Sequence, residues 1–336
     1  MSSIFLSPPI QKIHNPLADH LSIELYVLRL DLIHLQINGN KWFKLKYNLL
    51  EAKHNQCTSL LTFGGAYSNH IFATAAAGRI FGFETIGVIR GEPTLPLNPT
   101  LRFAQEQGMK LLYCDRQTYR QRHTQEVQED LKQQLPRSSN ETFIIPEGGG
   151  NLNGVRGCME IMQDIQFFDI ICLACGTATT LTGIALSPRD RTNLPTRIMG
   201  FPVLKDARFL EGEIDRLISD YLNSKLPTLV NHPTSWQLIY DYHFGGYGKI
   251  DRQLIQFCHQ FHQQHHIPLD YIYTGKMFYG VIDLLKQGFF PPSKILLIHT
   301  GGLQGNLGIE QKLTQKGIMT PNPFKQCESE PTPDRF

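Results

Sequence analysis

Short apolar runs alternate with longer stretches of helical periodicity along most of this chain. One run, Ile170-Ile171-Cys172-Leu173-Ala174, has no charged or strongly polar side chain on either face. Strands that are buried on both faces are typical of parallel sheets, and the helices between them supply the crossovers that parallel strands require. The pattern therefore predicts an α/β fold in which helices cover parallel sheets.

Length and residue type locate the individual elements. Apolar runs bounded by turn residues predict strands, and longer stretches with apolar residues at helical spacing predict helices. The predicted strands are 23–28, 59–63, 85–89, 110–113, 142–145, 169–174, 197–201 and 294–299. The predicted helices are 68–81, 124–135, 153–165, 206–222 and 276–287. A length of 336 residues predicts two domains.

Composition and charge narrow the class of protein. The chain is 41% hydrophobic and 18% charged, with a net charge of +2, and its basic residues are scattered. This argues against nucleic-acid binding, and the absence of an apolar run of roughly 18 residues argues against a membrane span. The first residues lack the pattern of a secretory signal, and the seven cysteines are dispersed. We therefore expect free thiols and a cytoplasmic location.

Two neighbouring segments near the N-terminus carry candidate chemistry. Lys41 follows Gly39-Asn40 and precedes two aromatic residues, so apolar surroundings are available to lower the pKa of its amine, as a Schiff-base lysine requires. Gly64-Gly65-Ala66-Tyr67-Ser68-Asn69 follows a predicted strand and opens a predicted helix. Helix N-termini bind anions and polar ligands, although Ser68 or Asn69 can equally serve as a helix cap.

A second glycine turn lies at the end of a buried strand. Cys175-Gly176-Thr177-Ala178-Thr179-Thr180 clusters backbone amides and hydroxyls without bulky side chains, which suits a phosphate monoester. The turn has no Walker lysine, so a nucleotide triphosphate is not favoured. Further on, Tyr273-Thr274-Gly275-Lys276 ends a strand-like run and begins a helix, and Tyr247 lies in a glycine-broken aromatic segment. Tyrosine hydroxyls can transfer protons, but packing explains most tyrosines equally well.

Rival chemistries lack their signatures. Cys258, His262 and His266 share a helical face, and Cys172 and Cys175 form a separate pair, but neither set has the spacing of known metal sites. We therefore predict no metal. The nucleophile elbow of α/β-hydrolases and the glycine fingerprint of dinucleotide-binding proteins are also absent from the sequence.

Five segments together resemble the 1-aminocyclopropane-1-carboxylate deaminase / D-cysteine desulfhydrase family. They are Asn38-Gly39-Asn40-Lys41-Trp42-Phe43-Lys44-Leu45, Phe63-Gly64-Gly65-Ala66-Tyr67-Ser68-Asn69-His70, Pro146-Glu147-Gly148-Gly149, Tyr273-Thr274-Gly275-Lys276 and His299-Thr300-Gly301-Gly302. The family consists of pyridoxal-phosphate enzymes with the tryptophan synthase β-subunit fold, or fold type II. The resemblance implies a large domain of residues 1–45 plus 151–318 and a small domain of residues 46–150. Residues 319–336, with four prolines from Thr320 on, are expected to form a flexible tail.

The resemblance also implies roles for individual residues. Lys41 would bear pyridoxal 5'-phosphate as a Schiff base and move the Cα proton of the substrate, with Ser68 beside it as a proton relay or substrate contact. Asn69 would bind the 3'-oxygen of the cofactor. Thr274 would face the pyridine nitrogen. Lys44 would bind the phosphate together with Gly176, Thr177, Ala178, Thr179 and Thr180, and Tyr247 and Tyr273 would flank the substrate.

The residue at position 274 bears on the reaction. A carboxylate there would keep the ring nitrogen protonated and deepen the electron sink, whereas a threonine hydroxyl would leave the ring closer to neutral. Ring-opening members of the family carry glutamate at this place, and D-cysteine desulfhydrases carry threonine. The resemblance therefore implies a lyase that acts on a small amino acid, with D-cysteine as the preferred substrate. It also implies a homodimeric assembly.

Two other functions stay open. One is deamination of the cyclopropane amino acid to 2-oxobutyrate and ammonia. The other is a non-catalytic homologue that binds the cofactor, because three residues depart from the family pattern: Trp42, Phe43 where arginine is common, and Tyr67 in place of glutamine. A nicotinamide oxidoreductase shares the gross fold class but requires the glycine fingerprint that this sequence lacks.

Overall fold

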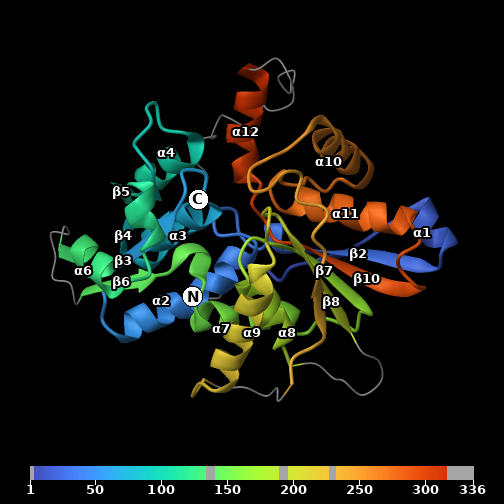
Figure 1. Cartoon of the computed structure of the whole chain (residues 1–336), viewed down its shortest axis with the longest axis horizontal. Coiled ribbons are helices and arrows are strands. Elements are labelled where there is room, and N and C mark those ends of the chain that lie inside the picture. Colours follow the sequence, from blue (N-terminus) through green and yellow to red (C-terminus); the bar gives the residue numbers. More distant parts are fainter. Residues whose placement is uncertain (1–3, 134–140, 189–195, 227–231, 316–336) are drawn as a thin grey trace, which may run out of the picture.

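The protein is built around two twisted sheets, shown by a computed structural model that describes residues 4–133, 141–188, 196–226 and 232–315 (Figure 1). The larger sheet has the order β1-β2-β10-β7-β8-β9 and the smaller one the order β5-β4-β3-β6. Both sheets are parallel apart from the β1–β2 pair. Strands β3 to β6 come from residues 59–145, and the larger sheet from the segments on either side. The division into domains at residues 46 and 150 stays a prediction.

The predicted strands are all present in the structure. They are β2 (Ile23–Arg29), β3 (Ser59–Gly64), β4 (Glu84–Arg90), β5 (Lys110–Cys114), β6 (Thr142–Ile145), β7 (Ile170–Cys175), β8 (Arg197–Pro202) and β10 (Ser293–His299). Every residue of β7 is buried, as a central parallel strand requires. Two edge strands were not predicted, β1 (Ile10–Ile13) and β9 (Trp236–Leu238), and both are too short to show a clear periodicity. The strand-like run before residue 274 is a turn instead.

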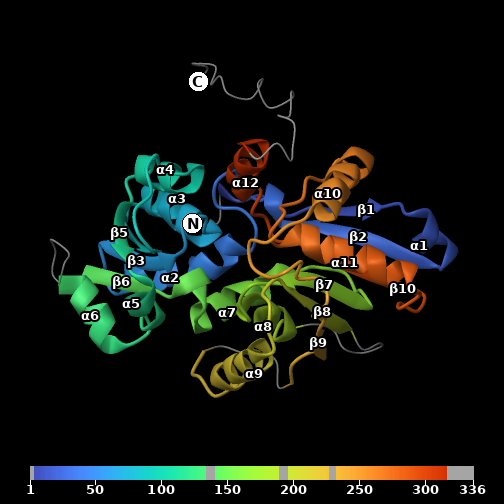
Figure 2. The same cartoon turned by 45° about the horizontal axis from the view of Figure 1, so that its top comes forward.

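Helices cover both faces of the larger sheet (Figure 2). On one side, α7 (Leu152–Met159), α8 (Thr179–Ala185) and α9 (Phe209–Leu222) form a core with α2 (Asn40–His54). On the other side lie α1 (Pro16–His20), α10 (Arg252–His265) and α11 (Thr274–Lys286). The smaller sheet packs between α5 (Arg116–Arg120) with α6 (Gln125–Gln133) on one face and α3 (Asn69–Phe81) with α4 (Pro99–Glu106) on the other. The chain ends its described part in α12 (Gln304–Gln315). The predicted tail at 319–336 lies outside the described residues.

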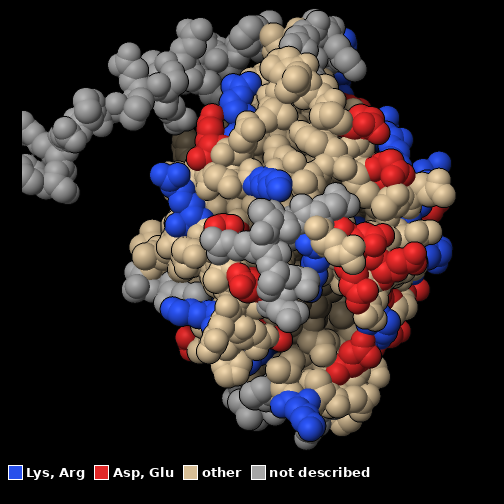
Figure 3. All heavy atoms as spheres, turned by 90° about the vertical axis from the view of Figure 1, so that its left-hand side faces the viewer, with Lys and Arg blue, Asp and Glu red and all other residues tan. Residues whose placement is uncertain are grey.

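The mixture of charged side chains on the surface agrees with the small net charge of the chain. On the face at the left of Figure 1, Lys and Arg side chains are interspersed with Asp and Glu (Figure 3). No helix within the described residues is long and apolar enough to cross a membrane. The cysteines that the structure describes carry free thiols, and all but Cys57 are buried.

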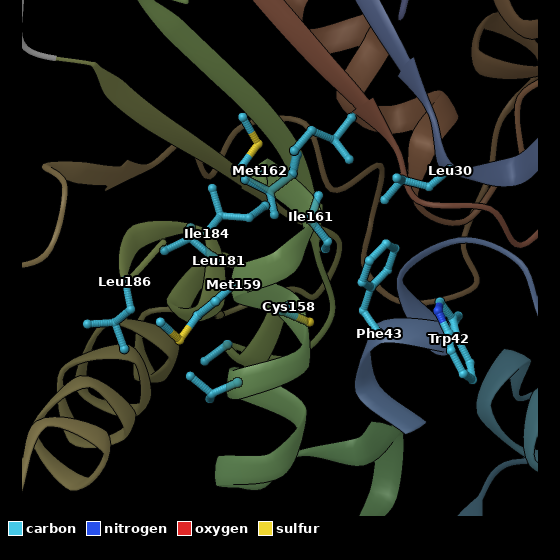
Figure 4. Packing of buried hydrophobic residues seen from close by; sticks show 14 of the residues in the cluster. Leu30, Trp42, Phe43, Cys158, Met159, Ile161, Met162, Leu181, Ile184 and Leu186 are labelled. Atoms are coloured by element: carbon cyan, nitrogen blue, oxygen red, sulfur yellow. The ribbon is translucent and has the colours of Figure 1, made fainter. Parts of the chain in front are cut away.

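Aromatic residues of α2 pack into the core between the sheets (Figure 4). Trp42 stacks on Phe5 with ring centroids 3.6 Å apart and also contacts Phe81. Phe43 is 9% exposed and belongs to the same core cluster as Met159 and Ile161. Both departures from the family pattern in α2 therefore serve packing, because their side chains are buried in this cluster.

The tightest helix contact in this core joins α2 to α7. A Cβ atom at position 157 would lie 1.7 Å from the carbonyl oxygen of Phe43. Glycine at 157 therefore lets the two backbones touch, and this contact sets the position of the first turns of α2.

We expect Gly157→Ala to lower the free energy of unfolding by about 1–3 kcal/mol, because the new methyl group meets backbone that cannot rotate away. Gly212→Ala in α9 is the matched control, since its Cβ would meet no atom within 4 Å. Alanine there should stabilise the helix by about 0.4–1 kcal/mol. Urea unfolding of the parent and both variants measures the two effects, and an unchanged midpoint for Gly157→Ala would rule out the contact.

Candidate active site

Loops at the carboxyl ends of three strands meet at the first turn of α2. Strand β3 leads into residues 65–68, β7 into residues 176–178 and β10 into residues 300–303. The Asn40 amide donates to Thr180 Oγ1 at 2.9 Å, and its backbone N–H donates to the carbonyl of Thr300 at 3.3 Å. The carboxyl edge of parallel strands is the usual place for a ligand in α/β proteins. The predicted segments thus follow the carboxyl ends of strands in both sheets, β3 in the smaller one and β7 and β10 in the larger one.

Lys41 lies in this junction, half-buried, with its Nζ donating to Asn40 Oδ1 at 2.8 Å. Burial, and then the charge of Lys44, lower the pKa of the Lys41 amine to about 7, while Cys158 and Asp270 act in the opposite direction. A large part of the population therefore carries a neutral amine at neutral pH. A neutral amine is the form that attacks a carbonyl carbon.

Lys44 and the glycine turn after β7 form an anion site. Lys44 is 3% exposed, and its Nζ donates to Thr177 Oγ1 at 2.9 Å. Burial lowers the pKa of its amine, so a bound anion would stabilise its charged form. Thr179 Oγ1 lies 3.5 Å from the Thr177 hydroxyl. Thr180 accepts the Asn40 amide, and its hydroxyl also hydrogen-bonds to Cys158.

Ser68 caps and Asn69 begins α3, at the carboxyl end of β3. The Ser68 hydroxyl caps the helix by accepting from the backbone N–H groups of His70 and Ile71, at 3.2 and 3.3 Å. Its own proton stays available for donation. Asn69 Oδ1 accepts from Gln304 at 3.1 Å, which leaves the Nδ2 group as a donor. Both side chains can therefore donate to a ligand oxygen while they hold the helix start in place.

Tyr247 and Tyr273 form the remaining wall. Their rings meet edge to face with centroids 6.0 Å apart, and Tyr273 lies so close to Gly176 that a Cβ there would be 2.7 Å from its ring. Burial raises the pKa of Tyr247 and raises that of Tyr273 well above its usual value, with Tyr247 adding to the latter shift. Both phenols therefore stay protonated at neutral pH, and their hydroxyls hydrogen-bond to each other.

Thr274 is fully buried behind Tyr273 and bonded to Asp270. Its hydroxyl donates to Asp270 Oδ2 at 2.5 Å and accepts the backbone N–H of Asp270 at 3.0 Å. Gly302 lies between Asp270 and Asn69, since a Cβ there would be 2.7 Å from Asn69 Nδ2 and 3.6 Å from Asp270 Cγ. One lone pair of the Thr274 hydroxyl is left for a ligand.

Several residues near the site were not assigned a role from the sequence. Asp270 lies just before the Tyr-Thr-Gly-Lys segment, and its carboxylate accepts from the backbone N–H of Thr274, the first residue of α11. An acidic residue four positions before a helix start is the sequence feature that could have indicated this contact. Lys276 and Glu147 lie inside two of the segments that resemble the family. Glu147 forms an ion pair with Arg122, in which Oε2 lies 2.6 Å from Nη2. His70 is buried, with Nε2 2.9 Å from Thr62 Oγ1 and with no partner for Nδ1 among the described residues. Burial, and then Lys41 and Lys44, lower the pKa of His70 well below its usual value.

Comparisons with known proteins give the site its context. Residues 9–301 match the model of the pyridoxal-phosphate dependent enzyme family. A Pyrococcus horikoshii protein, provisionally named a 1-aminocyclopropane-1-carboxylate deaminase, is 32% identical over 91% of this chain and 92% of its own length. The bifunctional D-cysteine desulfhydrase/1-aminocyclopropane-1-carboxylate deaminase of Arabidopsis thaliana is 27% identical over 92% of this chain and 79% of its own length. The crystal structure of an ACC deaminase homologue superimposes with a TM-score of 0.77 at 29% identity, covering 93% of this chain and 94% of the other.

These likenesses agree with the chemistry of the donor groups. An amine with a pKa near 7 suits an aldehyde, and a buried ammonium beside a hydroxyl suits a phosphate ester. The fold is that of the type II pyridoxal-phosphate enzymes. This chain belongs to the pyridoxal-phosphate dependent enzyme family, as a lyase of the 1-aminocyclopropane-1-carboxylate deaminase / D-cysteine desulfhydrase group.

Proposed function

We propose that this protein is a D-cysteine desulfhydrase, which converts D-cysteine and water into pyruvate, hydrogen sulfide and ammonia. The observation that carries the proposal is the group at position 274. It is a neutral hydroxyl, so it places no negative charge of its own against a ligand, whereas a carboxylate at this position would keep the ring nitrogen protonated. An electron sink without a directly bound carboxylate favours loss of a good leaving group such as thiolate over the opening of a cyclopropane ring.

Each predicted residue has a part in this proposal. Lys41 would hold the cofactor aldehyde and, once released, would take the Cα proton of the substrate. Lys44 and the turn of residues 176–180 would bind the phosphate, Asn69 would donate to the 3'-oxygen, and Thr274 would face the ring nitrogen. The geometry that supports these roles is the placement of Lys41 and Lys44 one turn apart on α2, with Thr177 within hydrogen-bonding distance of Lys44.

The remaining groups act on the substrate. Ser68 would relay a proton or contact the substrate, and Tyr247 and Tyr273 would flank it with protonated phenols. The bound cofactor supplies the electron sink. The Cβ–S bond then breaks, thiolate leaves, and the released aminoacrylate takes up water to give pyruvate and ammonia. A homodimer stays a prediction from the resemblance, and a cytoplasmic location stays a prediction from the sequence pattern.

The purified holoenzyme should release sulfide and pyruvate from D-cysteine, and little 2-oxobutyrate from 1-aminocyclopropane-1-carboxylate, because thiolate is by far the better leaving group. Colorimetric sulfide and coupled assays of the two oxoacids, run at equal substrate concentrations, measure the difference. Preferential formation of 2-oxobutyrate would replace the proposal with the ring-opening deaminase. A yellow protein that yields no product from D- or L-amino acids would support the non-catalytic homologue.

The pKa of Lys41 gives a second prediction. Attachment of pyridoxal phosphate to the apoprotein requires the neutral amine, so its rate should rise from about pH 6 and level off above about pH 8. A lysine with an ordinary pKa near 10.5 would still accelerate attachment at higher pH. Borohydride trapping followed by peptide mass mapping locates the modified residue at each pH.

Two variants complete this experiment. Lys41→Ala should lose the attachment at this site and lower turnover by about 10²- to 10⁴-fold or more. Lys46→Ala, on the same helix, should keep the parent profile, because Lys46 pairs with Glu160 away from the junction. Modification of Lys46 instead of Lys41, or a rate that keeps climbing toward pH 10, would refute the assignment.

A further inference from the structure

The segment that carries Tyr247 has no regular secondary structure. Residues 242–248 form consecutive turns and bends. Phe244, Gly245, Gly246 and Gly248 have φ of 53°, 87°, 114° and 70°, so most of this short loop is in the left-handed region. Such a backbone is not held by a sheet or a helix, and Tyr247 at its tip is 45% exposed. Local hydrogen bonds from Gly246 N to His243 O and from Lys249 N to Gly246 O shape the loop, and contacts from outside attach it to the rest of the protein.

One face of α11 supplies those contacts. The Lys276 Nζ donates to the carbonyl oxygens of His243 and Gly246, each at 2.9 Å. Seven residues later, Asp283 Oδ2 accepts from the Tyr242 hydroxyl at 2.9 Å. Spacings of four and seven residues keep a helical face in register, and between these two side chains the Tyr242 ring packs on Gly280. The loop is thus tied to α11 at both ends of its left-handed stretch.

The Lys276 ammonium lies where a positive charge is unfavourable, and the carbonyl groups of this loop compensate it. It is fully buried, and it belongs to the first turn of α11, where the helix dipole disfavours positive charge. Burial lowers the pKa of Lys276 to about 8, with Asp270 and Asp251 acting in the opposite direction. The amine remains largely protonated at neutral pH, so its bonds to the two carbonyls are charge-assisted.

The same helix also places the second tyrosine of the wall. Tyr273 is the residue that precedes α11, and its ring meets the Tyr247 ring edge to face. Lys276 lies three residues further along. The distance between the two phenols is therefore set by one helix, directly for Tyr273 and through Lys276 for Tyr247.

We propose that Lys276 is a positioning residue that fixes Tyr247 against Tyr273 by binding the carbonyl groups of His243 and Gly246. The inference rests on the proposed function in so far as Tyr247 contacts the substrate. Loss of the ammonium leaves the fold of α11 in place but frees the loop, and Tyr247 then no longer holds one position relative to the bound amino acid.

Hydrogen exchange tests the first half of the proposal without any substrate. Lys276→Met removes the charge at similar volume, and Lys286→Met makes the same change at an exposed site on the same helix. In the cofactor-loaded protein, amides of residues 242–249 should exchange about tenfold faster or more in Lys276→Met, the factor expected for loss of a bond to a charged group. Lys286→Met should match the parent. Unchanged exchange in Lys276→Met would overturn the proposal.

A kinetic cycle tests the second half. Tyr247→Phe and Lys276→Met should each lower kcat/KM for D-cysteine, and the double variant should be no worse than Tyr247→Phe alone, because both changes remove the action of one phenol. Multiplied losses would show that Lys276 acts elsewhere and would overturn the proposal. Lys276→Gln, whose amide keeps two donors without the charge, should restore part of the protection and part of the activity. It also decides the question if Lys276→Met does not fold.

The two experiments separate this proposal from the proposed function. If D-cysteine is not a substrate, the exchange measurement still reports whether Lys276 holds the loop, and the kinetic cycle is repeated with the amino acid that is turned over. Faster exchange together with multiplied losses would show that Lys276 holds the loop but does not act through Tyr247. That result would overturn the proposal.

Discussion

The arrangement of the site depends on how the first turn of α2 is fixed between two strand-end loops. Gly39, which precedes the helix, has a φ of 66° and lies so close to Thr300 that a Cβ would be 1.9 Å from its carbonyl oxygen. On the other side, the Asn40 amide binds Thr180 at the start of α8. Only glycine fits the first position, and an amide of this length spans the gap at the second. Lys41 follows directly, so its direction is set before any ligand binds.

Three lysines close to this junction are held in environments that disfavour their charge. Burial is the largest cause of the lowered pKa for Lys41, Lys44 and Lys276. Buried amines are expensive unless a partner compensates them, and the partners differ: an amide oxygen for Lys41, a threonine hydroxyl for Lys44 and two carbonyls for Lys276. Lys276 thus has two carbonyl partners, whereas Lys41 and Lys44 each have one polar partner from the protein.

Much of the fold follows from local pattern, whereas parts of the site do not. Strands such as β7 are readable because a run of apolar residues between turns has few other solutions in a chain of this length. The glycine turns after β3 and β7 are readable because strand, turn and helix follow in sequence order. Asp270 was missed because its effect reaches the site through Thr274, a contact that depends on the conformation of a turn. Lys276 lies in a segment that resembles the family, but the sequence predicted no role for it. The carbonyl groups that it binds lie some thirty residues away in the chain. The short edge strands β1 and β9 gain their order from pairing with their neighbours.

The two groups of active-site residues are attached to different sheets. Lys41 and Lys44 share α2, which is tied to the larger sheet through Asn40, Thr177 and the close contact with α7. Ser68 and Asn69 begin α3, which follows the central strand of the smaller sheet. A rotation of the smaller sheet would therefore carry the serine and asparagine away as a unit and leave both lysines where they are. The position of one sheet relative to the other therefore sets how far the serine and the asparagine lie from the two lysines.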